Sequence, residues 1–410
     1  MRSLKILFLG GAVPDDIMEK IANNEKTQPQ IAAHKLNWNI IKGVESCFGK
    51  PIDIISSIPI SDYPNYPKIF IGYRTWIRFK KSQIYSMPFI NVIVLKHITR
   101  FLSSLILVSI WLVKHRNYTK PQVLIYPMYS PYVLATLIAT FILGGKAILI
   151  IPDLPKYMDM SKQKSLIKRI LKPLDIYIMN KLVNKMSGVI VLTRYIAEDI
   201  IKSKVPFIVM EGIVPVKYNV DRQDLGQTGI KTKKIILYAG GLIEEYGVKM
   251  LIDAFALIKD EDYRLWLFGR GELEELIKHA SQKDHRIKYW GIVSNTELTN
   301  KQLQSTVLVN LKLSKSSFTK YSFPSKILEY MVSGHPVITT KLLGIPEEYF
   351  QYLFVLHNET PEELAKLLIK VCSMDTNALS KFGKQAKEFV YNNKNYYIQG
   401  KRIYDFLKTL

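Results

Sequence analysis

The chain contains very little cysteine. Its 410 residues include only two, Cys47 and Cys372. Two cysteines provide neither the ligand spacing of a zinc site nor a disulfide framework. The sequence also lacks a cluster of carboxylates that would suggest a bound metal ion. We therefore expect a protein of the reducing cytoplasm that uses no metal cofactor.

The sequence also lacks an apolar run long enough for a signal peptide or a membrane span. The run within residues 1–13 is short, and Gly10 and Gly11 fit better as a turn after a strand. The run from Phe101 to Val113 has 13 residues, against the roughly 20 that a spanning helix needs. We expect it to form a helix that covers the first sheet.

That apolar segment allows a second interpretation, in which one edge of the helix meets lipid. Basic residues on either side of the run would then lie near lipid headgroups, namely Lys96, Arg100, Lys114 and Arg116. The stretch 161–186 is a further basic, amphipathic helical pattern, with a break expected at Pro173. Its basic face could be solvated or could face a membrane.

Acidic residues are scarce in the front half of the chain. Residues 1–220 hold 30 Lys or Arg against 13 Asp or Glu, whereas residues 221–410 hold 27 against 22. The excess of positive charge predicts an anionic partner, such as an acidic membrane surface, nucleic acid or a phosphorylated substrate. It could also serve solubility alone. No motif combines basic with aromatic residues and the basic residues are scattered, so we expect no nucleic-acid partner.

Short β-rich apolar runs alternate with helical patterns in both halves of the chain. This alternation predicts an α/β protein with parallel sheets covered on both faces. We expect two doubly wound domains, residues 1–220 and 221–395, joined through the polar stretch 217–234. Residues 396–410 are predicted to form a last helix that returns to the first domain.

A proline opens a predicted helix in the stretch 322–338, "SFPSKILEYMVSGHPVI". With Pro324 as the first helical residue, the N–H groups of Ser325 and Lys326 would be unpaired, and they would form an anion site together with the helix dipole. Lys326 is unfavourable there unless an anion binds. Glu329 lies about one turn further along the same face, where a carboxylate can accept hydrogen bonds from both ribose hydroxyls. The pattern fits a nucleoside diphosphate.

The same residues also allow a purely structural interpretation. Ser325 could cap the helix, Lys326 could be a solvated surface charge, and Glu329 could pair with a neighbouring lysine. The physical pattern alone leaves both interpretations open.

Four segments carry a resemblance to a known family. Residues 321–340, "YSFPSKILEYMVSGHPVITT", followed by "GIPEEY", resemble the donor-site signature of retaining glycosyltransferases of the GT-B fold, family 4. Upstream, "ILYAGGLIEEYGVKMLIDAF", "LWLFGRGELEEL" and "IKYWGIVSNTEL" resemble the family's two glycine turns and its base-binding loop. The "FPSK…EY" variant resembles a subgroup of bacterial polysaccharide glycosyltransferases. The resemblance implies two Rossmann-like domains facing a central cleft, the first for the acceptor and the second for the donor.

The resemblance also implies roles for individual residues. Glu329 would bind ribose, and Ser325 and Lys326 would bind the diphosphate. Glycines would let the backbone approach the phosphates or the sugar, and a loop would meet the base mainly through its main chain. The glycines are Gly240 and Gly241, and the loop residues are Ile292 and Val293.

Three positions depart from the family's pattern. The first glutamate of its pair falls on Tyr321, so the usual contact of that position to the transferred sugar is in question. The two bases that normally hold the diphosphate fall on Gly241 and Tyr246. Lys326, together with Lys312, would have to supply the positive charge.

In the front domain, candidate acceptor-side residues follow predicted strands. Gly10 and Gly11 end the first strand, and Asp153 ends a later one, at the sheet edge where ligands gather in open parallel sheets. Asp153 could orient or deprotonate an acceptor hydroxyl, or it could be a simple turn residue.

Taken with the resemblance, the sequence predicts an enzyme that moves a hexosyl unit, with retention, from a nucleotide sugar to a lipid-linked or saccharide acceptor. The predicted setting is bacterial surface polysaccharide or glycolipid synthesis, peripherally on the inner face of the membrane. Alternatives are another GT-B enzyme such as a nucleotide-sugar 2-epimerase, or a catalytically silent protein that only binds sugar nucleotides.

Overall fold

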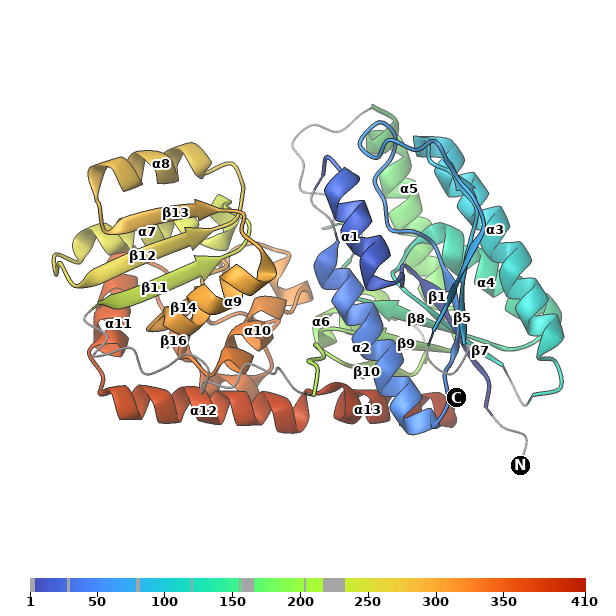
Figure 1. The fold of residues 1–410 in the computed structure, drawn as a ribbon. Coiled ribbons are helices and arrows are strands. Elements are labelled where there is room, and N and C mark those ends of the chain that lie inside the picture. The colour runs from blue at the N-terminus through green and yellow to red at the C-terminus, as the bar shows by residue number, and fades with distance from the viewer. Residues whose placement is uncertain are drawn as a thin grey trace. The chain divides into compact units, whose positions relative to one another are not determined.

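The chain consists of two compact units. Unit 1 comprises Met1–Ile213 and Tyr396–Leu410, and unit 2 comprises Val214–Asn395. The structure is a computed structural model that describes residues 4–27, 30–78, 82–118, 121–154, 156, 166–202, 204–216 and 233–410, without side chains for 166–171. Of the predicted linker 217–234, positions 217–232 lie outside the described residues. Each unit is described by itself (Figure 1).

Unit 1 is built on an eight-stranded sheet in the order β10-β9-β8-β7-β1-β2-β5-β4. All neighbours in it are parallel except β4 and β5. The strands are β1 (Ile6–Gly10), β2 (Asp53–Ser56), β4 (Arg74–Ile77), β5 (Gln83–Ser86), β7 (Gln122–Ile125), β8 (Lys146–Ile151), β9 (Gly188–Val191) and β10 (Phe207–Val209). A separate antiparallel pair joins β3 (Phe70–Ile71) to β6 (Phe89–Ile90). Strands β1, β7 and β9 are buried at every position, which requires helices on both faces of the sheet.

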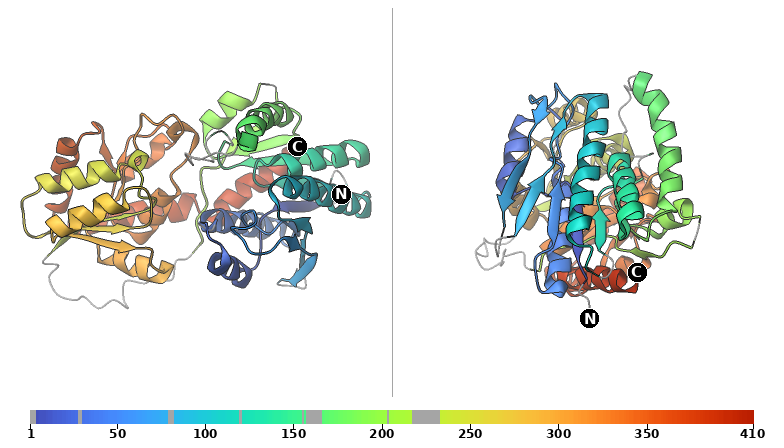
Figure 2. Two further views of the ribbon diagram at one scale, coloured as in Figure 1. Left: turned by 90° about the horizontal axis from the view of Figure 1, so that it is seen from above. Right: turned by 90° about the vertical axis from the view of Figure 1, so that its right-hand side faces the viewer.

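Three helices lie side by side on one face of this sheet (Figure 2, right). They are α3 (Ile93–Lys114), α4 (Ser130–Leu143) and α5 (Leu166–Val183). The other helices of the unit are α1 (Asp15–Asn24), α2 (Ile31–Phe48), α6 (Arg194–Ile200) and α13 (Tyr396–Thr409), with α13 packed against α2. The break expected at Pro173 is wrong, since α5 continues through it. A proline within a helix removes one backbone hydrogen bond, and here the helix continues despite that loss.

Helix α3 turns two of its basic residues, Lys96 and Arg100, inward. Lys96 Nζ donates to the backbone oxygen of Ile60 at 2.7 Å and to Asp62 at 2.8 Å. Arg100 donates to the backbone oxygen of Ile58 at 2.9 Å. Placing Lys96 and Arg100 near lipid headgroups is therefore wrong, because both are buried. By length and composition alone, α3 is the one helix within the described ranges that could cross a membrane, and it is longer than the sequence indicates.

The buried ammonium of Lys96 predicts a pH-dependent stability. Burial, helped by nearby Arg100, lowers the pKa of Lys96 from 10.5 to about 8. Between these values the unfolded chain binds more protons than the folded one, so the free energy of unfolding rises with pH, by at most about 3 kcal/mol. Urea unfolding near pH 8 and near pH 10 should show this rise in the wild type and not in Lys96→Met. Lys114→Met, an exposed cation on the same helix, is the control, and parallel curves for wild type and Lys96→Met would contradict the prediction.

Unit 2 is built on a six-stranded parallel sheet in the order β13-β12-β11-β14-β15-β16. Its strands are β11 (Lys234–Ala239), β12 (Tyr263–Phe268), β13 (Ile287–Gly291), β14 (Val307–Asn310), β15 (Val337–Thr340) and β16 (Phe354–Leu356). Its helices are α7 (Val248–Leu257), α8 (Glu274–Lys283), α9 (Asn295–Gln304), α10 (Ser325–Ser333), α11 (Pro361–Cys372) and α12 (Thr376–Asn393). The predicted α/β class with parallel sheets is confirmed. Because the strand order reverses between β11 and β14, the carboxyl ends of these two strands border the crevice where such sheets bind ligands.

Candidate functional site

The helix predicted to hold an anion begins one residue later than expected. Pro324 is the N-cap of α10, with ψ of 97°, so the helix starts at Ser325 and Pro324 is not its first residue. Ser325 is exposed and does not cap the helix. Among the residues that the structure describes, the backbone N–H groups of Ser325 and Lys326 have no hydrogen-bond partner. This is the amide arrangement that attracts anions at a helix start.

Lys326 and Glu329 form an ion pair with each other. Lys326 Nζ lies 3.1 Å from a carboxylate oxygen of Glu329, and the two side chains are 35% and 34% exposed. The structural interpretation, in which Glu329 pairs with a lysine, is thus realised through Lys326 itself. An ion pair this exposed contributes about 1 kcal/mol or less. Both groups face solvent, and a ligand that bound both could replace their contact at little cost.

Tyrosine hydroxyls fix α10 against the loop that follows β11. Tyr330 Oη donates to the backbone oxygen of Ala239 at 3.1 Å and lies 3.0 Å from its N–H. Burial raises the pKa of Tyr330, so its hydroxyl stays protonated. Tyr238 Oη donates to the backbone oxygen of Gly241 at 2.7 Å. Tyr330, which follows Glu329, therefore ties α10 to the last residue of β11, directly before Gly240.

Lys312 lies at the other side of the point where the strand order reverses. It follows β14, and its Nζ lies 5.0 Å from the centre of the Tyr246 ring and 5.8 Å from that of Phe318. The Tyr246 ring also covers Gly241, since a Cβ there would meet the ring at 3.1 Å. Lys312 thus places a positive charge beside the ring of Tyr246. Tyr246 is one of the two positions at which the family pattern normally has a basic residue.

The glycine loops after β11 and β12 touch through their backbones. Gly269 has φ of +126°, and a Cβ on it would overlap the carbonyl oxygen of Gly240. Gly240 N–H in turn donates to the backbone oxygen of Phe268 at 3.1 Å. Close packing of the two backbones therefore explains why position 269 is a glycine, without any ligand. The same packing holds the Gly240 loop at the carboxyl edge of the sheet.

Other predicted donor-side residues differ in their accessibility. Ile292 follows β13 and is 61% exposed, whereas Val293 packs against a hydrophobic cluster of unit 2. Tyr321 is only 6% exposed at the end of a short 3-10 helix, Thr319–Tyr321, and Lys320 Nζ lies 4.6 Å from the centre of its ring. Ile292, Lys326 and Glu329 are therefore more accessible to a ligand on the surface of unit 2 than Tyr321 is.

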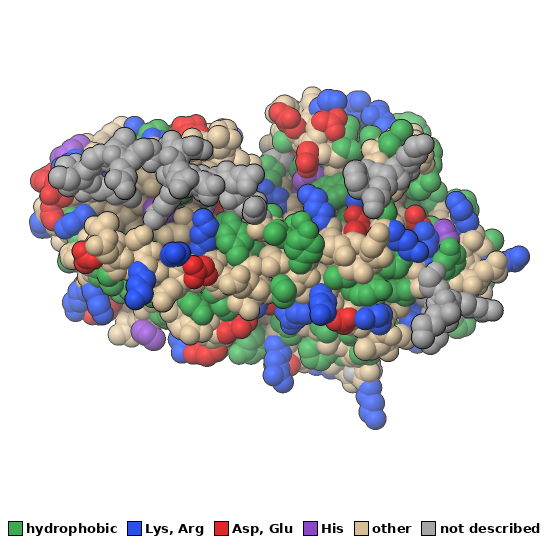
Figure 3. Space-filling view, turned by 60° about the horizontal axis from the view of Figure 1, so that its bottom comes forward, with side chains coloured by type: hydrophobic (Ala, Val, Ile, Leu, Met, Phe, Trp, Pro, Cys, Tyr) green, Lys and Arg blue, Asp and Glu red, His purple; other side chains and the backbone are tan. Residues whose placement is uncertain are grey.

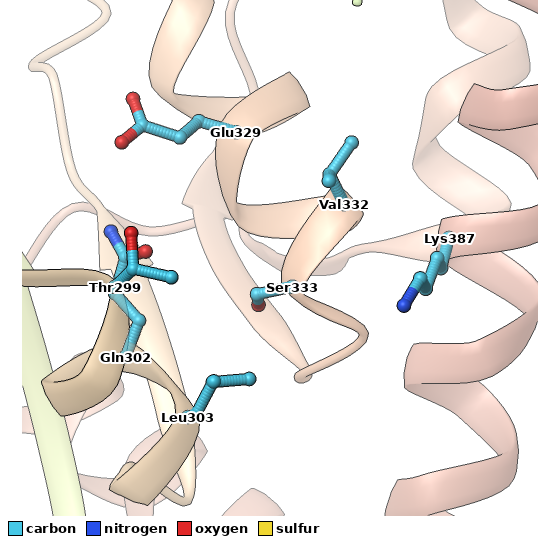
Figure 4. Close-up of a pocket in the computed structure, with 7 residues that line it drawn as sticks. All are labelled: Thr299, Gln302, Leu303, Glu329, Val332, Ser333 and Lys387. Atoms are coloured by element: carbon cyan, nitrogen blue, oxygen red, sulfur yellow. The ribbon is translucent and has the colours of Figure 1, made fainter. Parts of the chain in front are cut away.

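A small pocket borders Glu329 between α9, α10 and α12 (Figure 4). It is lined by Thr299, Gln302, Leu303, Glu329, Val332, Ser333 and Lys387. Its cavity volume of ≈ 30 Å³ has room for a few water molecules at most, so it does not hold a nucleoside by itself. Gln302 and Lys387 were not predicted from the sequence, because no motif links these positions of α9 and α12 to the donor signature. The pocket shows that the Glu329 carboxylate borders open space.

The front-domain candidates lie along one edge of the unit 1 sheet. Gly10 ends β1, Gly11 follows it, and half-buried Asp153 follows β8. Strand β7 separates these two strands, and Tyr126, which the sequence did not single out, follows it. Burial raises the pKa of Tyr126, with a smaller contribution from the Asp153 charge. The described residues contain no group of three or more His, Cys, Asp or Glu that could hold a metal ion.

Comparison with known proteins bears on both the fold and unit 2. Residues 221–389 match the family model described as Glycosyl transferases group 1. Sucrose-phosphate synthase from Thermosynechococcus elongatus is similar in structure, with a TM-score of 0.67 and 15% identity over 99% of this chain and 98% of that one. Anabaena HepE in complex with UDP and glucose follows with a TM-score of 0.61 and 16% identity over 100% of both chains.

The lipopolysaccharide outer core galactosyltransferase WaaB, in its apo form, has a TM-score of 0.61 and 16% identity over 99% of this chain and 100% of that one. A search of curated proteins gave no match. The likenesses confirm the predicted GT-B fold with its two Rossmann-like domains. The match over 221–389 covers less than half of the chain, and it supports the predicted class of enzyme, a glycosyltransferase.

Proposed function

We propose that the protein is a retaining glycosyltransferase that moves a hexosyl unit from a nucleotide-diphosphate sugar to a lipid-linked or saccharide acceptor. The observation that carries the proposal is the start of α10, where two free amides, Lys326 and Glu329 lie together on a helix that Tyr330 ties to the end of β11. The likeness to HepE in complex with UDP and glucose supports a nucleotide sugar as the donor.

The geometry suggests how departure of the nucleotide would be assisted. The diphosphate would accept hydrogen bonds from the backbone amides of Ser325 and Lys326. It would also displace the Lys326 ammonium from Glu329. Glu329 would then be released to accept hydrogen bonds from the ribose hydroxyls. Preorganised positive charge at the leaving diphosphate stabilises the charge that develops there. Lys312 would add to this charge from the end of β14.

On the acceptor side, Asp153 is the proposed group that orients or deprotonates the acceptor hydroxyl. Its position after β8, at the same sheet edge as Gly10 and Gly11, supports this role. We place the reaction in bacterial surface polysaccharide or glycolipid synthesis, with the enzyme peripheral on the inner face of the membrane. The basic front half and the likeness to WaaB support that setting. No metal cofactor is part of the proposal.

The proposal predicts that nucleotide sugars stabilise the protein. A ligand present at a hundred times its dissociation constant raises the free energy of unfolding by about 2.7 kcal/mol. A thermal-shift panel of nucleotide-diphosphate sugars should therefore reveal the donor as a rise in Tm, and the free sugar should give no rise. Failure of every nucleotide sugar to raise the Tm would contradict the donor site.

The same panel leads to the assay of turnover. With the donor so identified, an added lipid-linked or saccharide acceptor should yield a glycosylated product with the anomeric configuration of the donor retained. Conversion of the donor alone to an epimer would instead show a 2-epimerase. Tight binding with no product under any condition would show a silent binding protein.

A further inference from the structure

The outer face of α3 is apolar along its whole length. Six of its exposed aliphatic residues recur every three or four positions and so form one stripe, Leu95, Ile98, Leu102, Ile106, Ile110 and Val113. These side chains are between 45% and 59% exposed. Six large aliphatic side chains in one continuous stripe are uncommon on a surface that meets only water.

Lys96, Arg100 and Ser104 of α3 are buried on its inner face. Lys96 and Arg100 are bonded to the segment 58–62, as described above, and Arg100 also stacks on the ring of Phe89 at 4.2 Å. About three turns further on, Trp111 Nε1 donates to Asp53 at 2.8 Å. A helix that separates a protein core from water has the opposite polarity. The inversion indicates that the outer face of α3 meets an apolar environment.

The end of α4 continues this surface. Helix α4 packs beside α3 in the same layer (Figure 2, right). Phe141 and Ile142, near its C-terminus, are 91% and 70% exposed. A phenylalanine this exposed is favourable where it can enter the boundary between headgroups and acyl chains.

The segment that contains α3 and α4 carries charge of one sign, and two of its basic residues, Lys96 and Arg100, are buried. Residues 63–152, which include all of α3 and α4, hold eleven Lys or Arg and no Asp or Glu. Lys114 and Arg116 are exposed at the C-terminal end of α3. In the space-filling view, hydrophobic side chains of unit 1 lie at the surface among Lys and Arg side chains, with some Asp and Glu side chains between them (Figure 3). A second copy of this chain would bring the same positive charges and be repelled, whereas anionic headgroups would attract them.

We propose that the stripe on α3 and the end of α4 form the surface through which unit 1 docks on an anionic lipid bilayer. The inner face of α3 stays packed on unit 1 through Lys96, Arg100 and Trp111, so the helix lies along the bilayer and does not cross it. Only the link between this surface and a lipid-linked acceptor rests on the proposed function. This surface is the part of the molecule that meets the membrane.

The test is flotation of the purified full-length protein with lipid vesicles. The wild type should float with vesicles of phosphatidylcholine and phosphatidylglycerol at low salt, less at high salt, and little with phosphatidylcholine alone. The variant Leu102→Ser/Ile106→Ser/Ile110→Ser should lower partitioning to the anionic vesicles by about a hundredfold, since each half-exposed aliphatic side chain contributes a few-fold to insertion. The matched control, Leu257→Ser/Leu276→Ser/Ile369→Ser, removes three exposed aliphatic residues from unit 2 and should float as the wild type does.

Every other outcome overturns the proposal. Wild-type protein that stays at the bottom of the gradient with anionic vesicles excludes a bilayer as the partner. Equal flotation of wild type and the α3 variant places the membrane contact elsewhere. A wild-type dimer by light scattering that the α3 variant dissociates would make a second copy the occupant. None of these readouts needs donor or turnover, so a failure here is distinct from a failure of the transferase proposal.

Discussion

Glu329→Gln is expected to weaken nucleotide binding and lower kcat/KM by about a hundredfold to a thousandfold. A carboxylate that accepts two ribose hydrogen bonds contributes about 1.5–3 kcal/mol through each, and the neutral amide loses most of this. The folded state should be almost unaffected, because the pair with Lys326 is one-third exposed and weak. Isothermal titration with the nucleoside diphosphate identified by thermal shift measures the loss.

The ribose contact has a more specific signature. The wild type should bind the 2′-deoxy form of the nucleotide about tenfold or more less tightly than the ribose form, and Glu329→Gln should bind both alike, since the interaction lost is the same. Glu363→Gln breaks a comparable pair, with Lys366 at 2.7 Å on α11, and should change neither affinity. A variant that still prefers ribose by the wild-type ratio would remove Glu329 from the site.

Much of unit 2 could be predicted from the sequence because the geometry of its candidate site is local. Ser325, Lys326 and Glu329 lie within two turns of one helix, and helical spacing alone puts their polar groups on one end and face. The apolar runs of β11 to β16 are each bounded by turn residues and are fully visible in the sequence. Start positions remained uncertain by a residue, as the N-cap position of Pro324 shows.

Contacts between distant residues could not be predicted. The bond of Tyr330 to Ala239 joins positions 91 residues apart, and it is this bond that holds α10 beside the glycine loop. Likewise, the place of Lys312 beside Tyr246 depends on β11 and β14 being neighbours in the sheet. The sequence pointed to Lys312 only through the family resemblance, and it did not single out Tyr330.

The front unit was predicted less completely, and the polarity of α3 shows why. Its sequence pattern marks a helix, but the assignment of its inner face depends on what the segment 58–62 offers. Backbone oxygens of Ile58 and Ile60 accept from Arg100 and Lys96, so the cations turn inward and the aliphatic residues outward. The short strands β2 to β6 also escaped prediction, because runs of two to four residues carry little periodicity.

Gly400→Ala is expected to destabilise unit 1 by about 3 kcal/mol, as overpacking of a close helix contact does. Gly400 of α13 faces Gly43 of α2, and a Cβ on Gly400 would overlap the Cα and carbonyl of Gly43, so the two backbones would have to separate. Scanning calorimetry should show a Tm lower by on the order of 10 °C for the transition of unit 1. Lys401→Ala, one residue along and exposed, should leave the Tm unchanged. Equal melting of the two variants would mean that α13 is not seated on α2. Because α13 begins directly after unit 2 ends at Asn395, a large effect would show that the stability of unit 1 depends on the last helix of the chain.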